Sequence, residues 1–307
     1  MPSSITGSSR RELLAGVAAV AAVAKYAPET SARGKEEEVK TWRVYGNCRF
    51  GQIHFYMAAP KADGRVAHPL ICLHESPASG DSFREFQAVM ALDRLVICPD
   101  TPGYGDSDCP SAVPTIEEYG AAIIEALNSI DIKGPIDVLG CHTGTFIAAA
   151  IGRQRPAFAN RLVMAGIPYY PASERAGKLV QYGHPPPLFS NPEYFAQSWR
   201  ELVLEHKVNG LPQERQLNAF VERMGTGFKS WYALDAVFRY DADSALGNLR
   251  QPVLCPVISD TLALPTRAAA KLIRKSTIVD CEELDSDAWQ VKPDQLAAAI
   301  QPFLART

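Results

Sequence analysis

The sequence predicts an α/β fold, in which a mostly parallel sheet is covered by helices on both faces. Three observations predict it. Short, continuous apolar runs recur along the chain, as in strands that are buried on both faces. These runs alternate with segments of helical periodicity, which is typical of parallel strands joined by crossover helices. One apolar run also ends in a tight turn bounded by Gly140 and Gly144, after which a helical pattern begins.

The elements follow in order along the chain. Apolar and polar residues alternate over 42–45 and 52–57, which predicts a hairpin. Buried strands are expected at residues 69–74, 94–98, 136–139, 161–165, 252–260 and 277–279. Helices are expected at residues 82–92, 115–130, 145–154, 266–275 and 293–304. Thr115 and Glu118 have the spacing of a capping box, and Pro293 suits a first helical turn.

Residues 171–248 interrupt this alternation. They contain prolines, helical patterns and many aromatic side chains, but no buried strand. We expect a helical lid over the carboxyl edge of the sheet. Most of its aromatic residues should pack the lid onto the core, and some could line a pocket for an apolar or aromatic small-molecule substrate. The chain then divides into residues 1–33, a core of 34–170 with 249–307, and a lid of 171–248.

The N-terminus has the pattern of an export signal. Arg10 and Arg11 precede a weakly hydrophobic run over residues 15–24, which resembles a twin-arginine (Tat) signal. The run is too short to cross a bilayer comfortably, so no stable membrane anchor is expected. This pattern predicts a signal and linker over residues 1–33 and a periplasmic or exported protein. The alternative is an N-terminal extension of a cytoplasmic protein.

Composition excludes several classes of function. The chain has 307 residues, 47% of them hydrophobic and 21% charged, which is ordinary for a globular protein. A net charge of −3 provides no basic surface for nucleic acid. The seven cysteines include no C-x-x-C pair, and no G-x-G-x-x-G loop opens the first helix. No metal and no cofactor are therefore expected, and nothing in the sequence specifies an oligomeric state.

The turn between Gly140 and Gly144 has one possible centre. In a sharp strand-to-helix turn, the residues two before and two after the centre approach closely, so only small side chains fit there. With glycines at 140 and 144 the centre is His142. A frame centred on Cys141 would need a small residue at 139, where the chain has leucine.

Together these segments resemble the α/β-hydrolase fold over residues 40–307. Residues 73–79 are similar to that family's oxyanion turn, and residues 100–108 to its D-x-P-G-x-G-x-S loop. Residues 140–144 match the nucleophile elbow. The insertion after Ala165 falls where the family's lid falls.

The resemblance also assigns positions in the site. It places His142 where the family has a serine nucleophile, and the backbone N–H groups of Ser76 and Thr143 where it has oxyanion donors. The family's acid position is occupied by Leu262, two residues after Asp260. The stretch that matches the family's catalytic histidine, residues 285–289, has none, and no histidine follows residue 206. A Ser-His-Asp triad in the family's order cannot be built.

Two neighbouring side chains complete the expected site. His74 should brace the oxyanion turn, and Glu75 replaces the glycine that the family has after that histidine. A carboxylate there would oppose a developing oxyanion unless it points away or pairs.

We therefore expect His142 to act as a general base, or as an atypical nucleophile, in a cofactor-free hydrolase or lyase for small carbonyl or ester-type compounds. The helix N-terminus should lower its pKa, and Asp260, Asp285 or Asp287 could orient its ring. The alternative is a catalytically inactive hydrolase fold that binds a ligand or partner in its pocket. Cys141 as the nucleophile is a further, weaker alternative.

Overall fold

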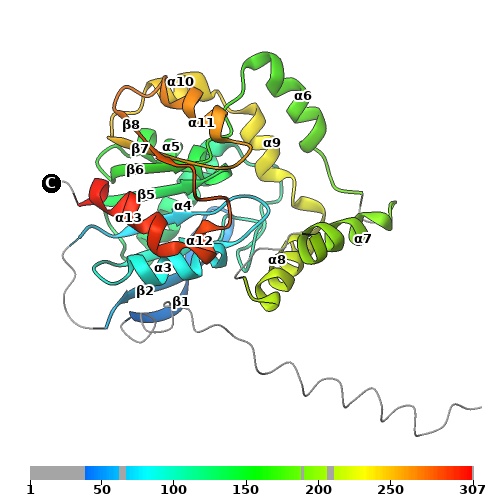
Figure 1. The fold of residues 1–307 in the computed structure, drawn as a ribbon, viewed down its shortest axis with the longest axis horizontal. Coiled ribbons are helices and arrows are strands. Elements are labelled where there is room, and N and C mark those ends of the chain that lie inside the picture. Colours follow the sequence, from blue (N-terminus) through cyan, green and yellow to red (C-terminus); the bar gives the residue numbers. More distant parts are fainter. Residues whose placement is uncertain (1–38, 62–66, 188–189, 206–210, 306–307) are drawn as a thin grey trace, which may run out of the picture.

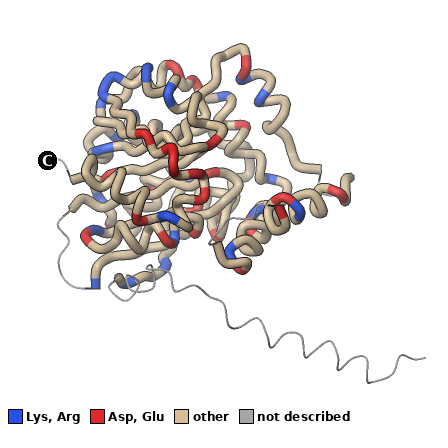
Figure 2. The backbone as a smooth tube through the Cα atoms, viewed as in Figure 1, with Lys and Arg blue, Asp and Glu red and all other residues tan. Residues whose placement is uncertain are grey.

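The computed structural model describes residues 39–61, 67–187, 190–205 and 211–305. The proposed export signal and His206 lie outside these ranges. Within them, no helix combines the length and the apolarity that a membrane span needs. Figure 2 shows basic and acidic residues interspersed along the described chain, in keeping with the small net charge.

One eight-stranded sheet organises the fold (Figure 1), with the strand order β1-β2-β4-β3-β5-β6-β7-β8. The strands are β1 (Val39–Cys48), β2 (Gly51–Pro60), β3 (Leu70–Leu73), β4 (Val96–Pro99), β5 (Ile136–Cys141), β6 (Ala159–Ala165), β7 (Val253–Ile258) and β8 (Ser276–Cys281). β1 pairs with β2, and β2 with β4, in antiparallel register. The remaining neighbours are parallel, which confirms the fold class expected from the sequence.

Helices cover both faces of the sheet. The helices α4 (Ile116–Ser129) and α5 (Thr143–Gln154) pack on one face, with α11 (Ala263–Ala270) contributing to the same apolar core. The helices α3 (Arg84–Met90), α12 (Ala288–Val291) and α13 (Pro293–Leu304) pack on the other face.

The short strand β3 shows why its sequence is continuously apolar. Ile71 and Leu73 point into the core beneath α4 and α5, whereas Leu70 and Cys72 point into the core beneath α3 and α13. All four are fully buried, because successive strand side chains face opposite sides of a sheet that is covered on both.

Most element boundaries agree with the sequence prediction; the differences concern α11 and α12. The capping box at the start of α4 is present, since Thr115 and Glu118 each accept the other's backbone N–H. The helix expected at 266–275 instead spans 263–270, because Asp260 Oδ1 accepts the Leu262 N–H at 2.7 Å and fixes the preceding turn. The short helix α12 was not predicted.

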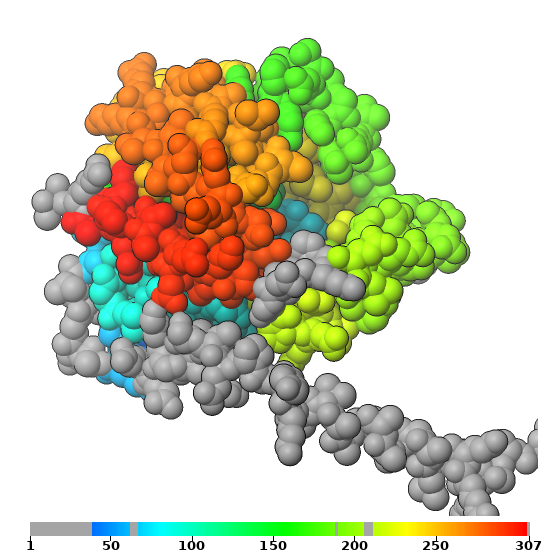
Figure 3. Space-filling model, viewed as in Figure 1, coloured from blue at the N-terminus to red at the C-terminus, as the bar shows by residue number. Residues whose placement is uncertain are grey.

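The insertion between β6 and β7 is helical in its described part. It contains α6 (Ala172–Tyr182), α7 (Glu193–Trp199), a π-helical turn (Arg200–Glu205), α8 (Gln213–Gly225), α9 (Tyr232–Arg239) and α10 (Ala242–Gly247). In the space-filling view α7 and α8 project from one side of the molecule (Figure 3). Several of its aromatic residues pack on one another, as in the edge-to-face pair of Trp199 and Phe220.

Candidate active site

The turn at residues 140–144 forms a strained elbow. β5 ends at Cys141 and α5 begins at Thr143, so His142 stands alone between them with φ +47° and ψ −113°. A Cβ on Gly140 would lie 2.3 Å from the Gly144 carbonyl oxygen, and a Cβ on Gly144 would lie 2.1 Å from that of Leu73. Both positions therefore exclude any side chain, and the sequence prediction that His142 occupies the apex is confirmed.

Asp260, at the end of β7, reaches the His142 ring. Its Oδ2 lies 3.2 Å from His142 Nε2, and the imidazole is 31% exposed while the carboxylate is buried. An ionised carboxylate only accepts, so Nε2 carries the proton and the lone pair of the neutral ring lies on Nδ1. In the described part of the chain Nδ1 has no hydrogen-bond partner.

Gly166, which follows β6, leaves room for this pair. It has φ +65°, and a Cβ on it would lie 2.3 Å from His142 Cδ2. Any larger residue would push the imidazole away from Asp260. The sequence pattern had not singled out this glycine.

The other two candidate carboxylates lie beyond β8. Asp285 is exposed, and its Oδ1 accepts the backbone N–H of Asp287 at 3.2 Å. Asp287 is half-buried at the start of α12. Of the three candidates, Asp260 is the one for which the structure shows a hydrogen bond to the ring.

The pKa of His142 is raised, not lowered as expected from the helix N-terminus. Burial lowers the pKa of the ring, but the hydrogen bond to Asp260 and the negative charges of Glu75 and Asp260 raise it by more. The expected direction was wrong because a helix terminus acts as about half a charge, whereas two nearby carboxylates act as full charges. The imidazolium is therefore stabilised here.

The turn after β3 presents the expected backbone donors. His74 is fully buried; its Nδ1 donates to the Glu75 carbonyl oxygen at 2.6 Å, and its Nε2 accepts the Thr101 N–H at 2.9 Å. These bonds brace the turn, as the sequence predicted. The N–H groups of Ser76 and Thr143 donate to no other group in the described ranges.

A buried carboxylate that sequence reasoning missed holds the neighbouring loops. Asp100 accepts the backbone N–H groups of Gly80 at 2.7 Å and Asp106 at 2.9 Å, and its Oδ2 lies 2.9 Å from His54 Nδ1. His54 is fully buried, in accordance with a packing role. The position of Asp100 at the start of the D-x-P-G loop was the available signal, whereas nothing in the sequence linked it to His54.

Cys141 is unsuited to act as a nucleophile. Burial, followed by the charges of Glu75 and Asp260, raises the pKa of this thiol well above its ordinary value. The thiolate is the nucleophilic form, so a thiol held protonated in a buried position is inert.

Comparisons with known proteins identify the family of this chain. The family model described as "Alpha/beta hydrolase family" matches residues 70–299. The chain belongs to the alpha/beta hydrolase family. No significant match was found among curated protein sequences.

Solved structures share the fold of this α/β hydrolase at low sequence identity. A thermophilic esterase from Thermogutta terrifontis, in a malate-bound structure, is 18% identical with a TM-score of 0.67, covering 86% of this chain and 98% of its own. An enol-lactonase from Burkholderia xenovorans is 14% identical with a TM-score of 0.68, covering 86% and 100%. The esterase RhEst1 from Rhodococcus is 18% identical with a TM-score of 0.67, covering 86% and 98%.

A cavity of about 180 Å³ lies beside the turn after β3. It is bounded by the turn, the start of the following helix and α8, and none of its described lining residues is aromatic. The lining residues are Glu75, Pro77, Ala78, Asp81, Ser82, Leu202, Arg215, Asn218, Ala219, Glu222, Arg223 and Gln290.

Polar contacts anchor α8 at this cavity. Arg215 pairs with the Asp81 carboxylate, donates to the Asp81 carbonyl oxygen at 2.9 Å, and lies 3.2 Å from Glu85 Oε2. Ser79 Oγ donates to Glu222 Oε1 at 2.9 Å. Burial raises the pKa of Glu222 to about 7, and the charges of nearby carboxylates add to the effect.

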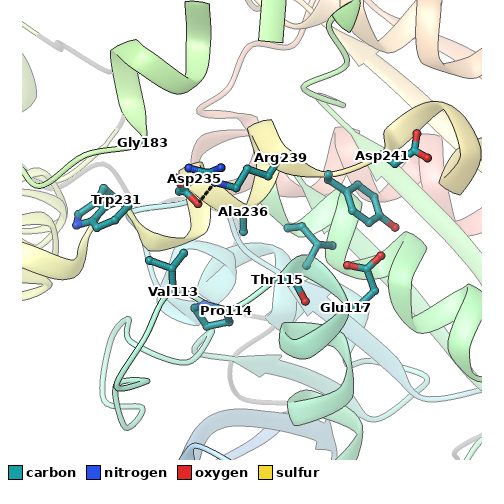
Figure 4. Close-up of a pocket in the computed structure, with 12 residues that line it drawn as sticks. Val113, Pro114, Thr115, Glu117, Gly183, Trp231, Asp235, Ala236, Arg239 and Asp241 are labelled. Carbon is teal, nitrogen blue, oxygen red and sulfur yellow. Dashed lines mark hydrogen bonds and ion pairs between the residues drawn. The ribbon is translucent and has the colours of Figure 1, made fainter. Parts of the chain in front are cut away.

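A second cavity, of about 570 Å³, lies between α9 and the start of α4 (Figure 4). Trp231 and Gly183 lie at one end of it, and an ion pair joins Asp235 to Arg239 with a nitrogen–oxygen distance of 2.7 Å. Its lining includes neither His142 nor Asp260. No cluster of metal-ligating side chains occurs within the described ranges.

Proposed function

We propose that the protein is a cofactor-free hydrolase or lyase that acts on a small carbonyl or ester-type compound. One observation carries the proposal: a partly exposed imidazole stands at the strained apex of the elbow, hydrogen-bonded to the buried carboxylate of Asp260. Strained positions of this kind cost about 1–3 kcal/mol and persist where they serve a function.

The geometry fits hydrolysis by an activated water. His142 Nδ1 takes a proton from water, and the hydroxide oxygen bonds to the substrate carbonyl carbon. Asp260 stabilises the resulting imidazolium, while the Ser76 and Thr143 N–H groups donate to the oxyanion. The imidazolium then returns its proton to the leaving oxygen as the carbon–oxygen bond breaks. Removal of a proton from carbon, with the N–H pair holding an enolate, would use the same groups in a lyase.

The comparisons support hydrolase chemistry in general. The family is named for hydrolysis, and the solved neighbours include two esterases and an enol-lactonase. The role of His142 as base, the lid function of residues 171–248 and the nature of the substrate are our proposals.

We also propose export through the Tat route, to be tested with a reporter fused after residue 33; the alternative is a cytoplasmic protein.

One observation favours a different function. Glu75 places a carboxylate in the oxyanion turn, close enough to Cys141 and His142 to raise the pKa of both. Such a charge opposes an oxyanion, as it would in a catalytically inactive protein that binds a ligand or partner. Once His142 has taken the proton from water, however, its positive charge offsets that of Glu75 while the oxyanion is present, and we therefore favour the enzyme.

Replacement of His142 tests the proposal. We expect His142→Ala to lower kcat/KM for a responsive substrate in a panel of 4-nitrophenyl esters, lactones and enol esters by about 10²–10⁴-fold. His184→Ala is the matched control, because this histidine is exposed in the insertion. Circular dichroism would establish that both variants are folded. Unchanged turnover in His142→Ala would refute the role of the base, and a panel without turnover would favour the binding protein.

A further inference from the structure

The cavity beside the turn after β3 contains a cation that no group in the described part of the chain neutralises. Arg223, on α8, lines this cavity, and its Nε is buried without a hydrogen-bond partner. Within the described part of the chain its guanidinium forms no ion pair. A buried N–H donor without an acceptor is costly, and a ligand that accepts a hydrogen bond from this Nε would remove that cost.

The acidic groups of the cavity are each stabilised in another way. Asp81 pairs with Arg215 and Arg84. Glu222 accepts the Ser79 hydroxyl. Glu75 interacts electrostatically with His142. Of the two arginines that line this cavity, Arg215 forms ion pairs and Arg223 forms none in the described part of the chain.

We propose that Arg223 binds a carboxylate carried by the substrate, so that the enzyme acts on carbonyl or ester compounds that bear a second, ionised carboxyl group. This inference rests on the proposed function of the same site. A guanidinium matches the two oxygens of a carboxylate with paired donors. A single cation balances one negative charge, whereas a phosphate dianion would also face Glu75 and Asp81.

The position of the cavity relates this carboxylate to the reacting carbonyl. The cavity wall includes Glu75, Pro77 and Ala78, which flank Ser76 and its oxyanion N–H. A substrate whose carbonyl oxygen meets the Ser76 N–H can therefore extend its other end between the turn and α8. His142 does not line the cavity itself, so binding there would position the substrate by holding its carbonyl at the Ser76 N–H.

Paired esters test the inference. The probes are the monomethyl and dimethyl esters of succinate, glutarate and adipate, with methanol release as the readout. We expect at least one monomethyl ester to have a kcat/KM about ten-fold above that of its dimethyl ester. Arg223→Gln should reduce this ratio to about one, and Arg200→Gln, an exposed arginine of the insertion, should keep it. The ratio is compared within each variant, so general losses of activity cancel.

Calorimetric binding of the free diacids to His142→Ala separates the two proposals. Diacid binding that Arg223→Gln removes, with no turnover of any ester, would refute the proposed function but support the carboxylate site. Turnover that depends on His142 but gives equal rates for both esters of every pair would overturn the carboxylate site alone. Loss of the ester preference in Arg200→Gln as well would also overturn it, because a general change of surface charge would then explain the effect.

Discussion

The elbow and the helical insertion are held in place by different kinds of interaction. α5, which follows the elbow, buries ten of its twelve residues, whereas α6 buries none and α8 only Gln216. Close backbone packing fixes the elbow. α8 meets the core through Arg215 and Glu222, whose contacts are ion pairs and a hydrogen bond.

This difference explains how a histidine can occupy the apex. The main chain sets the geometry of the elbow, so the apex side chain can change without loss of the turn or of its backbone N–H groups. The contacts of α8 depend on charge and solvation, so its attachment should respond to pH and to bound ligands.

The largest effect is expected at Gly144. A Cβ there would collide with the Leu73 backbone, so Gly144→Ala should destabilise the protein by about 3 kcal/mol or prevent folding. Urea unfolding, or the yield of folded protein, measures this. A Gly144→Ala variant of native stability would mean that side-chain packing, not backbone contact, holds the elbow.

The next largest effect concerns the His142–Asp260 pair. Asp260→Asn removes a charge that raises the His142 pKa, so that pKa should fall. The rising limb of the kcat/KM–pH profile should then move to lower pH, while the maximum drops about 10²-fold because the imidazolium loses its partner.

The exposed Asp285 provides the comparison. Asp285→Asn should change the maximum kcat/KM by less than two-fold, which corresponds to an activation free-energy change of about 0.4 kcal/mol or less. Equal losses in the two variants would show that Asp260 is not the specific partner of the ring.

A smaller effect is expected where α8 meets the core. The folded pKa of Glu222 is about 7, above its ordinary value of 4.5, so the folded state holds a proton that the unfolded state has released. Stability is therefore unaffected below pH 4.5 and falls as the pH rises to 7. Glu222→Gln keeps an acceptor for the Ser79 hydroxyl. It should reduce the fall in the free energy of unfolding between pH 4.5 and 7 by about 1–2 kcal/mol.

Thermal unfolding and hydrogen exchange of α8 at pH 5 and pH 8 would measure that difference. Glu214→Gln, on the same helix but exposed, serves as control. A pH dependence of stability that is identical in the wild type and Glu222→Gln would contradict the prediction.

The smallest effect is expected in the insertion. A Cβ on Gly177 of α6 would meet no atom within 4 Å. Gly177→Ala should therefore stabilise the protein by up to about 1 kcal/mol through helix propensity alone. Destabilisation would show that α6 packs more closely than the structure indicates, and the contrast with Gly144 would disappear.

Much of the fold could be predicted because its signals are local. Continuous apolar runs identified the buried strands, and the two glycines identified the elbow and its centre. The site was predicted less completely. Asp260 was one of three candidates, since the choice among loops at one sheet edge depends on side-chain distances. The pKa direction of His142 was wrong because it depends on carboxylates from two distant segments. Arg223 and Gly166 carried no local pattern.

By itself, the sequence determined the succession of the core strands and helices along the chain, because the periodicity of apolar residues acts over a few neighbours. It also placed a histidine where the family has a serine, because only glycine is small enough on either side of the turn. The tertiary structure decided that Asp260 pairs with His142 and that Glu75 helps to raise the pKa of His142. It also decided that Arg223 lines the cavity with no ion pair in the described part of the chain. These facts depend on hydrogen bonds and charges between residues more than 60 positions apart, whose approach is fixed when the sheet assembles and not by any local pattern.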